Sequence, residues 1–222
     1  MRTRVKICCI ASVEEAALAI SAGADAIGLV GPMPSGPGMI AGDVLRRIAA
    51  WTPPPVASFL LTTAVDAPGI IEHVRLSGTD TVQLVDLSTP EVCQAVRAAL
   101  PGVRVVQVLH VQGPEAVAQA QAFAPFVHAL LLDSGNPRAD VPTFGGTGKI
   151  HDWSVSRRIV EAVDVPVFLA GGLRPGNVQT AIRTVRPFGI DVCSGLRVEG
   201  ALCPTRLAAF MAEVRAADQD AG

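Results

Sequence analysis

The chain has 222 residues and a formal net charge of −2 at pH 7, and 50% of its residues are hydrophobic. This length suits one α/β domain, and the balanced charge lacks the basic excess of a nucleic-acid-binding protein. No apolar run reaches the eighteen or so residues that span a bilayer, so we expect no membrane association. The N-terminus MRTRVKICC lacks the apolar stretch of a signal peptide, and we therefore expect a cytoplasmic location.

Short β-branched apolar segments alternate along the chain with alanine-rich segments of helical period, which is typical of βα units. The predicted strands are Val5–Cys9, Ala26–Val30, Val56–Leu61, Thr81–Val85, Val103–Leu109, Val127–Leu132, Val165–Ala170 and Gly189–Val192. The predicted helices lie near Val13–Ala22, Gly42–Ala50, Pro68–Ser77, Pro90–Ala99, Pro114–Ala122, Ser154–Ala162, Pro175–Val185 and Thr205–Ala216.

This alternation predicts an α/β fold, a (β/α)8 TIM barrel that forms a single domain over residues 1–222. A doubly wound open sheet is the competing arrangement, but no G-x-G-x-x-G motif follows the first strand. The tail, residues 218–222, is expected to fray.

In such a barrel the active site forms at the C-terminal ends of the strands. Cys8 lies at the end of the first predicted strand, and Asp133 follows the sixth. A cysteine and an aspartate that the fold brings together can serve as a base and an acid. Lys6 points to the same face as Cys8, because residues i and i+2 of a strand share a face, and a positive neighbour favours the thiolate.

Lysine is rare in this chain: Lys6 and Lys149 are the two lysines among eighteen basic residues. Their placement in an apolar and a glycine-rich segment suggests chemistry, and Lys6 is a candidate substrate-binding residue as well as the positive neighbour of Cys8. For Lys149, a contact with substrate and a solvated loop position both stay open. The segment GGTGK around Lys149 does not complete a nucleotide-binding loop, because Thr143 and Ile150 occupy positions where that motif needs glycine and Ser/Thr.

Two loops predict a phosphate site. The seventh strand runs into the paired glycines Gly171 and Gly172, and the eighth runs through Asp191 into Ser194 and Gly195. Glycine turns and a following helix N-terminus direct backbone N–H groups toward an anion, and barrels often bind phosphate at these two loops. We therefore expect a small phosphorylated ligand.

The remaining cysteines and the histidines favour structural roles. Cys9, Cys93, Cys193 and Cys203 are badly spaced for disulfides, so we expect free, structural thiols in a reducing cytoplasm. The histidines lack the spacing of metal ligands, and no metal site is expected. His110, at the end of the fifth strand, is the histidine that merits a test.

Several segments, namely VKIC, LLLDS, FGGTGKIHDW, LAGGLRPGNV and VRPFGIDVCSG, resemble the phosphoribosylanthranilate isomerase family of tryptophan biosynthesis. The resemblance implies an Amadori rearrangement of an aminoribose phosphate that needs no metal or organic cofactor. It implies Cys8 as the general base and Asp133 as the general acid. It also implies a phosphate site at the GG and SG loops, with Asp191 near the ribose.

The chain departs from the family pattern at the end of the site that holds the aryl group. The family's arginine in the loop after the second strand aligns with Gly38, and QLHG reads QLVD, with Val85 in place of histidine. The KICG motif has become KICC. A paralogue that acts on another aminoribose phosphate, a phosphate-dependent barrel lyase or aldolase, and a non-catalytic phosphate-binding protein therefore remain as alternatives.

Overall fold

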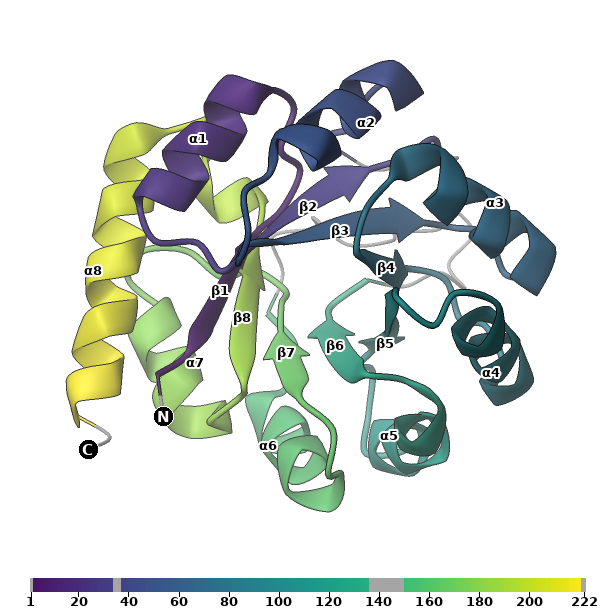
Figure 1. Ribbon diagram of the computed structural model, residues 1–222. Coiled ribbons are helices and arrows are strands. Elements are labelled where there is room, and N and C mark those ends of the chain that lie inside the picture. Colours follow the sequence, from purple (N-terminus) through teal and green to yellow (C-terminus); the bar gives the residue numbers. More distant parts are fainter. Residues whose placement is uncertain (1, 34–36, 136–149, 221–222) are drawn as a thin grey trace.

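The computed structural model describes residues 2–33, 37–135 and 150–220. Within them, eight parallel strands close into a barrel in which β1 pairs with both β2 and β8, and helices surround the strands (Figure 1). The strands are β1 (Arg4–Ile7), β2 (Ala26–Val30), β3 (Ala57–Thr62), β4 (Thr81–Leu84), β5 (Arg104–His110), β6 (Ala129–Asp133), β7 (Val167–Leu169) and β8 (Gly189–Val192). The outer α-helices are α1 (Val13–Ser21), α2 (Gly42–Trp51), α3 (Ala67–Ser77), α4 (Pro90–Ala99), α5 (Ala116–Phe123), α6 (Trp153–Ala162), α7 (Val178–Val185) and α8 (Pro204–Asp220).

This closed barrel confirms the predicted (β/α)8 fold, and the differences are local. β1 ends at Ile7 because Cys9 adopts a left-handed backbone conformation with φ of 63°. An unpredicted hairpin, β9 (Arg197–Val198) and β10 (Ala201–Leu202), precedes α8. The expected fraying from residue 218 is wrong, since α8 continues to Asp220. The carboxylate of Asp218 accepts hydrogen bonds from the backbone N–H and the hydroxyl of Thr3, at 2.9 and 2.7 Å.

Short polar side chains begin several of the helices. The side chains of Ser12, Asp66 and Thr89 each accept a hydrogen bond from the backbone N–H three residues later. Each cap satisfies one of the N–H groups that a helix leaves unpaired in its first turn. These three helices, α1, α3 and α4, therefore start where the sequence places a capping residue.

Alternation along the strands produces two apolar layers. One set of side chains fills the barrel interior, and the other packs between the strands and the helices. The interior set includes Phe59, Val106, Leu131 and Phe168. Because inward-facing residues recur at every second position, polar residues at the C-terminal strand ends project above this interior layer. Among the described residues, no helix has the length and apolar character needed to cross a membrane.

Candidate active site

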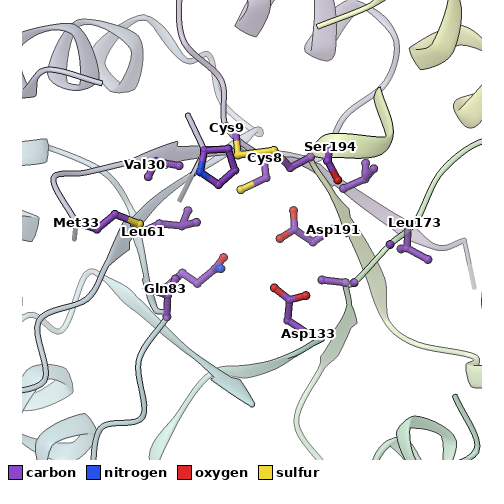
Figure 2. A pocket seen from close by; sticks show the side chains of 17 residues that line it. Cys8, Cys9, Val30, Met33, Leu61, Gln83, Asp133, Leu173, Asp191 and Ser194 are labelled. Atoms are coloured by element: carbon purple, nitrogen blue, oxygen red, sulfur yellow. A yellow bond between two sulfur atoms is a disulfide. The ribbon is translucent and has the colours of Figure 1, made fainter. Parts of the chain in front are cut away.

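A cavity lies over the C-terminal end of the barrel interior. Cys8, directly after β1, Asp133 at the end of β6 and Asp191 in β8 line it, as do Gln83 of β4 and Leu61 of β3 (Figure 2). The two carboxyl groups and the Gln83 amide point toward the centre of the cavity (Figure 2). The barrel therefore brings together the predicted base and acid, which are 125 positions apart in the chain (133 − 8).

Lys6 lies beneath the cavity floor. Its side chain is fully buried, and Nζ stands 2.9 Å from Oδ2 of Asp191. The contact is a close ion pair without the alignment of a hydrogen bond. The ammonium also sits 5.2 Å from the centre of the Phe59 ring, within the range of a cation–π contact. Lys6 therefore does not line the substrate cavity, where a substrate-binding residue would be expected.

Lys6 and Cys8 converge above Gly28 of β2. A Cβ atom at Gly28 would lie 2.7 Å from Sγ of Cys8 and 3.0 Å from Nζ of Lys6. The absence of that Cβ leaves the room in which the thiol and the ammonium meet. The prediction that the side chains of Lys6 and Cys8 lie on the same face of the strand is thus confirmed.

The charges around Cys8 oppose one another. Burial raises the pKa of the thiol to about 11, although the Lys6 ammonium lowers it and the Asp191 carboxylate raises it. For Lys6, burial works against the charged form, but the nearby Asp191 and Cys8 outweigh it and the pKa is raised. In the free protein Cys8 is therefore a thiol, held beside a permanent positive charge.

Asp133 is buried, and its environment favours the neutral carboxyl over the carboxylate. Burial raises the pKa of Asp133, and Asp191 adds to this, while the backbone N–H of Ser134 and His110 work against it. That N–H donates to Oδ1 of Asp133 at 2.7 Å. A raised pKa favours the protonated carboxyl, the form that a general acid needs.

His110 is the partner of Asp133 across the β5–β6 ladder. Its Nε2 lies 3.0 Å from the carbonyl oxygen of Val85, and its Nδ1 is buried without a partner in the described residues. His110 therefore lies beside the candidate acid, and a functional role for it stays a prediction.

The loops after β7 and β8 approach one another at the predicted phosphate site. Gly171 and Gly172 have positive φ angles of 84° and 66°. A Cβ atom at Gly195 would fall 2.0 Å from the carbonyl oxygen of Leu173, so the two loops can touch only with glycine at that position. A second cavity beside these loops is lined by Gly172, Leu173, Arg174, Pro175, Ser194, Gly195 and Arg206. Arg174 and Arg206 are charged residues that the motif analysis did not single out.

The expectation of free thiols is wrong for Cys9 and Cys193. These two cysteines form a disulfide with Cα atoms 6.0 Å apart, and it joins the segment after β1 to the loop after β8. Spacing in the sequence could not reveal the pair, because barrel closure brings β1 and β8 together. Cys8, Cys93 and Cys203 are free.

Arg197 is another residue that the sequence did not indicate. Its guanidinium pairs with the Glu15 carboxylate at 3.0 Å and donates to the carbonyl oxygens of Cys8 and Cys9. Arg197 therefore anchors the backbone that carries Cys8, and no local motif marks an arginine for this purpose.

Among the residues that the structure describes, the opposite wall is apolar, with one exception. Val30, Met33, Pro37, Leu61 and Val85 line the cavity there, together with the amide of Gln83. Gly38 has φ of 79°, and a Cβ atom at this position would lie 2.5 Å from Cβ of Cys9, so an arginine does not fit there. Lys149 lies outside the described residues.

Comparison with known proteins identifies relatives over nearly the whole chain. The family model for N-(5'phosphoribosyl)anthranilate (PRA) isomerase matches residues 5–212. The N-(5'-phosphoribosyl)anthranilate isomerase of Methanocella arvoryzae is 37% identical over 197 residues, which are 89% of this chain and 90% of the relative. That of Myxococcus xanthus is 39% identical over 221 residues, covering 98% of this chain and 97% of the relative.

Solved structures agree with this match. The crystal structure of phosphoribosyl anthranilate isomerase from Thermotoga maritima superposes with a TM-score of 0.83 at 29% identity, covering 96% of this chain and 99% of that one. A crystal structure of phosphoribosyl anthranilate isomerase in complex with reduced 1-(o-carboxyphenylamino)-1-deoxyribulose 5-phosphate superposes with a TM-score of 0.80 at 26% identity, with the same coverage.

Proposed function

Because the chain belongs to the N-(5'-phosphoribosyl)anthranilate isomerase family, we propose that it converts N-(5-phosphoribosyl)anthranilate to the corresponding 1-amino-1-deoxyribulose phosphate in tryptophan biosynthesis. The observation that carries the assignment is the convergence of Cys8 and Asp133 on one cavity that also reaches the loops after β7 and β8. The substrate is charged and does not cross membranes unaided, which supports a cytoplasmic location.

Asp133 is the general acid of the first step. Its carboxyl, whose protonated form is favoured because burial raises the pKa, gives a proton to the furanose ring oxygen. The C1′–O4′ bond breaks, and the lone pair of the amine nitrogen forms a C1′=N bond. The product of this step is an open-chain Schiff base with a protonated nitrogen, while Asp133 is left as the carboxylate.

Cys8 is the general base of the second step. In the fraction of the protein in which Cys8 is ionised, its thiolate takes the proton from C2′, and the electrons of that C–H bond form C1′=C2′ as the C1′=N electrons return to nitrogen. The enolamine then tautomerises to the ketone. Lys6 supports the thiolate electrostatically, since its positive charge lowers the pKa of Cys8. We therefore propose that Lys6 acts through Cys8, instead of contacting the substrate as its sequence position suggested.

The phosphate defines how the substrate lies. Gly171, Gly172, Ser194 and Gly195 would hold the phosphate through backbone N–H groups, at the loops after β7 and β8. The ribose then passes between Cys8 and Asp133, near Asp191, and the aryl group reaches the wall formed by β2, β3 and β4. Proton transfers among side chains and substrate account for each step, so the mechanism needs no cofactor.

A second candidate is the same rearrangement on another N-substituted aminoribose phosphate. It is favoured by the aryl wall, where the described residues Met33, Pro37 and Val85 are apolar and offer no cation for a carboxylate. A Schiff-base aldolase is disfavoured, because such an enzyme needs a neutral, reachable lysine. Lys6 is fully buried in an ion pair.

Complementation of a tryptophan auxotroph that lacks this isomerase tests the proposal, together with turnover of N-(5-phosphoribosyl)anthranilate by the purified protein. Cys8→Ser and Asp133→Asn should each lose about 10²- to 10⁴-fold in rate. Cys93→Ala removes a buried free cysteine outside the cavity and serves as the control. An inactive wild type that turns over a different aminoribose phosphate would favour the second candidate.

A further inference from the structure

The side chain of Gln83 is enclosed in the cavity wall, yet its oxygen has no partner. Gln83 is 3% exposed, and its Oε1 accepts no hydrogen bond from the residues that the structure describes. A buried amide oxygen without a donor destabilises the free protein, so an unpaired one calls for a specific explanation. At the wall of a candidate active site, that explanation is a donor supplied by the substrate.

A second buried glutamine of the barrel shows what a structural amide looks like here. Gln107 of β5 is fully buried, and its Nε2 donates to the carbonyl oxygens of Asp86 and Val108, each at 2.9 Å. Its Oε1 accepts from the hydroxyl of Ser88 at 2.7 Å. Gln107 is thus satisfied by the protein, whereas the oxygen of Gln83 is not.

The position of Gln83 in the barrel selects the substrate atom that it meets. Gln83 lies on β4, across the barrel from the β7 and β8 loops that would hold the phosphate, and its amide points toward Asp133 and Asp191 (Figure 2). A substrate anchored by its phosphate, with its ribose between the acid and the base, presents its linking nitrogen to this wall.

We propose that Gln83 is a substrate-contact residue whose Oε1 accepts a hydrogen bond from the N–H that joins the amine to the ribose. This inference rests on the proposed function. In the Schiff base that N–H carries positive charge, which returns to neutral as Cys8 removes the C2′ proton. A carbonyl dipole aimed at the N–H stabilises the charged species and orients C2′ toward the thiolate.

Replacement of Gln83 by methionine separates this role from a structural one. Methionine has a similar shape without an unsatisfied amide, so Gln83→Met should raise the Tm by about 2–4 °C. The same variant should lose about 10- to 100-fold in kcat/KM, because the substrate N–H is left buried and unpaired. Gln107→Met, the matched control, should lower the Tm, since it breaks hydrogen bonds that the protein makes.

Two ligands identify the donor. Wild type should bind the reduced carboxyphenylamino-deoxyribulose phosphate about tenfold more tightly than an analogue with an ether oxygen in place of the N–H. Gln83→Met should bind both with the same Kd. Equal preference for the N–H ligand in wild type and Gln83→Met would assign the donor elsewhere, for example to a ribose hydroxyl, and would overturn the proposal.

Further outcomes are decisive in the same experiment. A lower Tm for Gln83→Met with wild-type kcat/KM would make Gln83 a structural residue. Gln83→Leu repeats the test, and failure of both variants to fold would likewise show that the amide stabilises the free barrel. A wild type that turns over no aminoribose phosphate would overturn the proposed function as well, whereas an active wild type with a fully active Gln83→Met overturns this inference alone.

Discussion

Removal of the Lys6 ammonium should lower both the thermal stability of the barrel and the reactivity of Cys8. Lys6→Met leaves the Asp191 carboxylate buried without its partner 2.9 Å away. Removal of one member of a buried ion pair costs about 3–5 kcal/mol, and for a domain of this size the Tm falls about 2–4 °C per kcal/mol. Thermal unfolding should therefore show a loss of at least about 6 °C. Lys6→Met/Asp191→Leu, which removes both charges, should recover most of it.

The catalytic effect follows from the charges that surround the thiol. Lys6 lowers the pKa of Cys8 and Asp191 raises it. An adjacent opposite charge shifts a pKa by about 1–3 units, so Lys6→Met should reduce the thiolate fraction, and with it kcat/KM, about 10- to 1000-fold. Asp191→Asn should shift the pKa of Cys8 in the opposite direction.

The assay is the pH dependence of Cys8 alkylation, measured in a background in which Cys93 and Cys203 are replaced by alanine. These two are the other free cysteines of the structure described here. A shift of the Cys8 pKa in the same direction for Lys6→Met and Asp191→Asn would refute the electrostatic reasoning. Unchanged Tm and kcat/KM in Lys6→Met would refute the ion pair itself.

Three further predictions concern the phosphate site, the pH profile and the aryl wall. Inorganic phosphate at millimolar concentration should raise the Tm of wild type, and Gly195→Ala should abolish the shift, because its Cβ would fall 2.0 Å from a carbonyl oxygen; a wild type insensitive to phosphate would contradict the site. The reactive form pairs a Cys8 thiolate with a protonated Asp133. Burial raises the Cys8 pKa to about 11, so kcat/KM should not change with pH between the raised Asp133 pKa and about pH 9. At pH values below the Asp133 pKa, kcat/KM should fall, because both groups are then protonated. Val85→His should lower the KM for the anthranilate substrate. A micromolar KM in wild type that becomes higher in Val85→His would show that the wall already accommodates the carboxylate.

Much of this protein was determined by local sequence. The alternation of apolar strands and alanine-rich helices predicts the barrel, because inside and outside positions repeat with the period of each element. Strand ends then place Cys8, Asp133 and the two glycine loops on one face, since parallel strands in a barrel all end at the same side. The shared face of Lys6 and Cys8 follows from the same period of two.

The tertiary structure decided which side chains meet. Closure of β1 against β8 pairs Lys6 with Asp191 and joins Cys9 to Cys193. Local periodicity predicts neither contact, because the partners lie at opposite ends of the chain. The unpaired oxygen of Gln83 is likewise a property of the assembled cavity. Whether a buried polar atom has a partner depends on every strand around it, and spacing along one strand carries no record of the others.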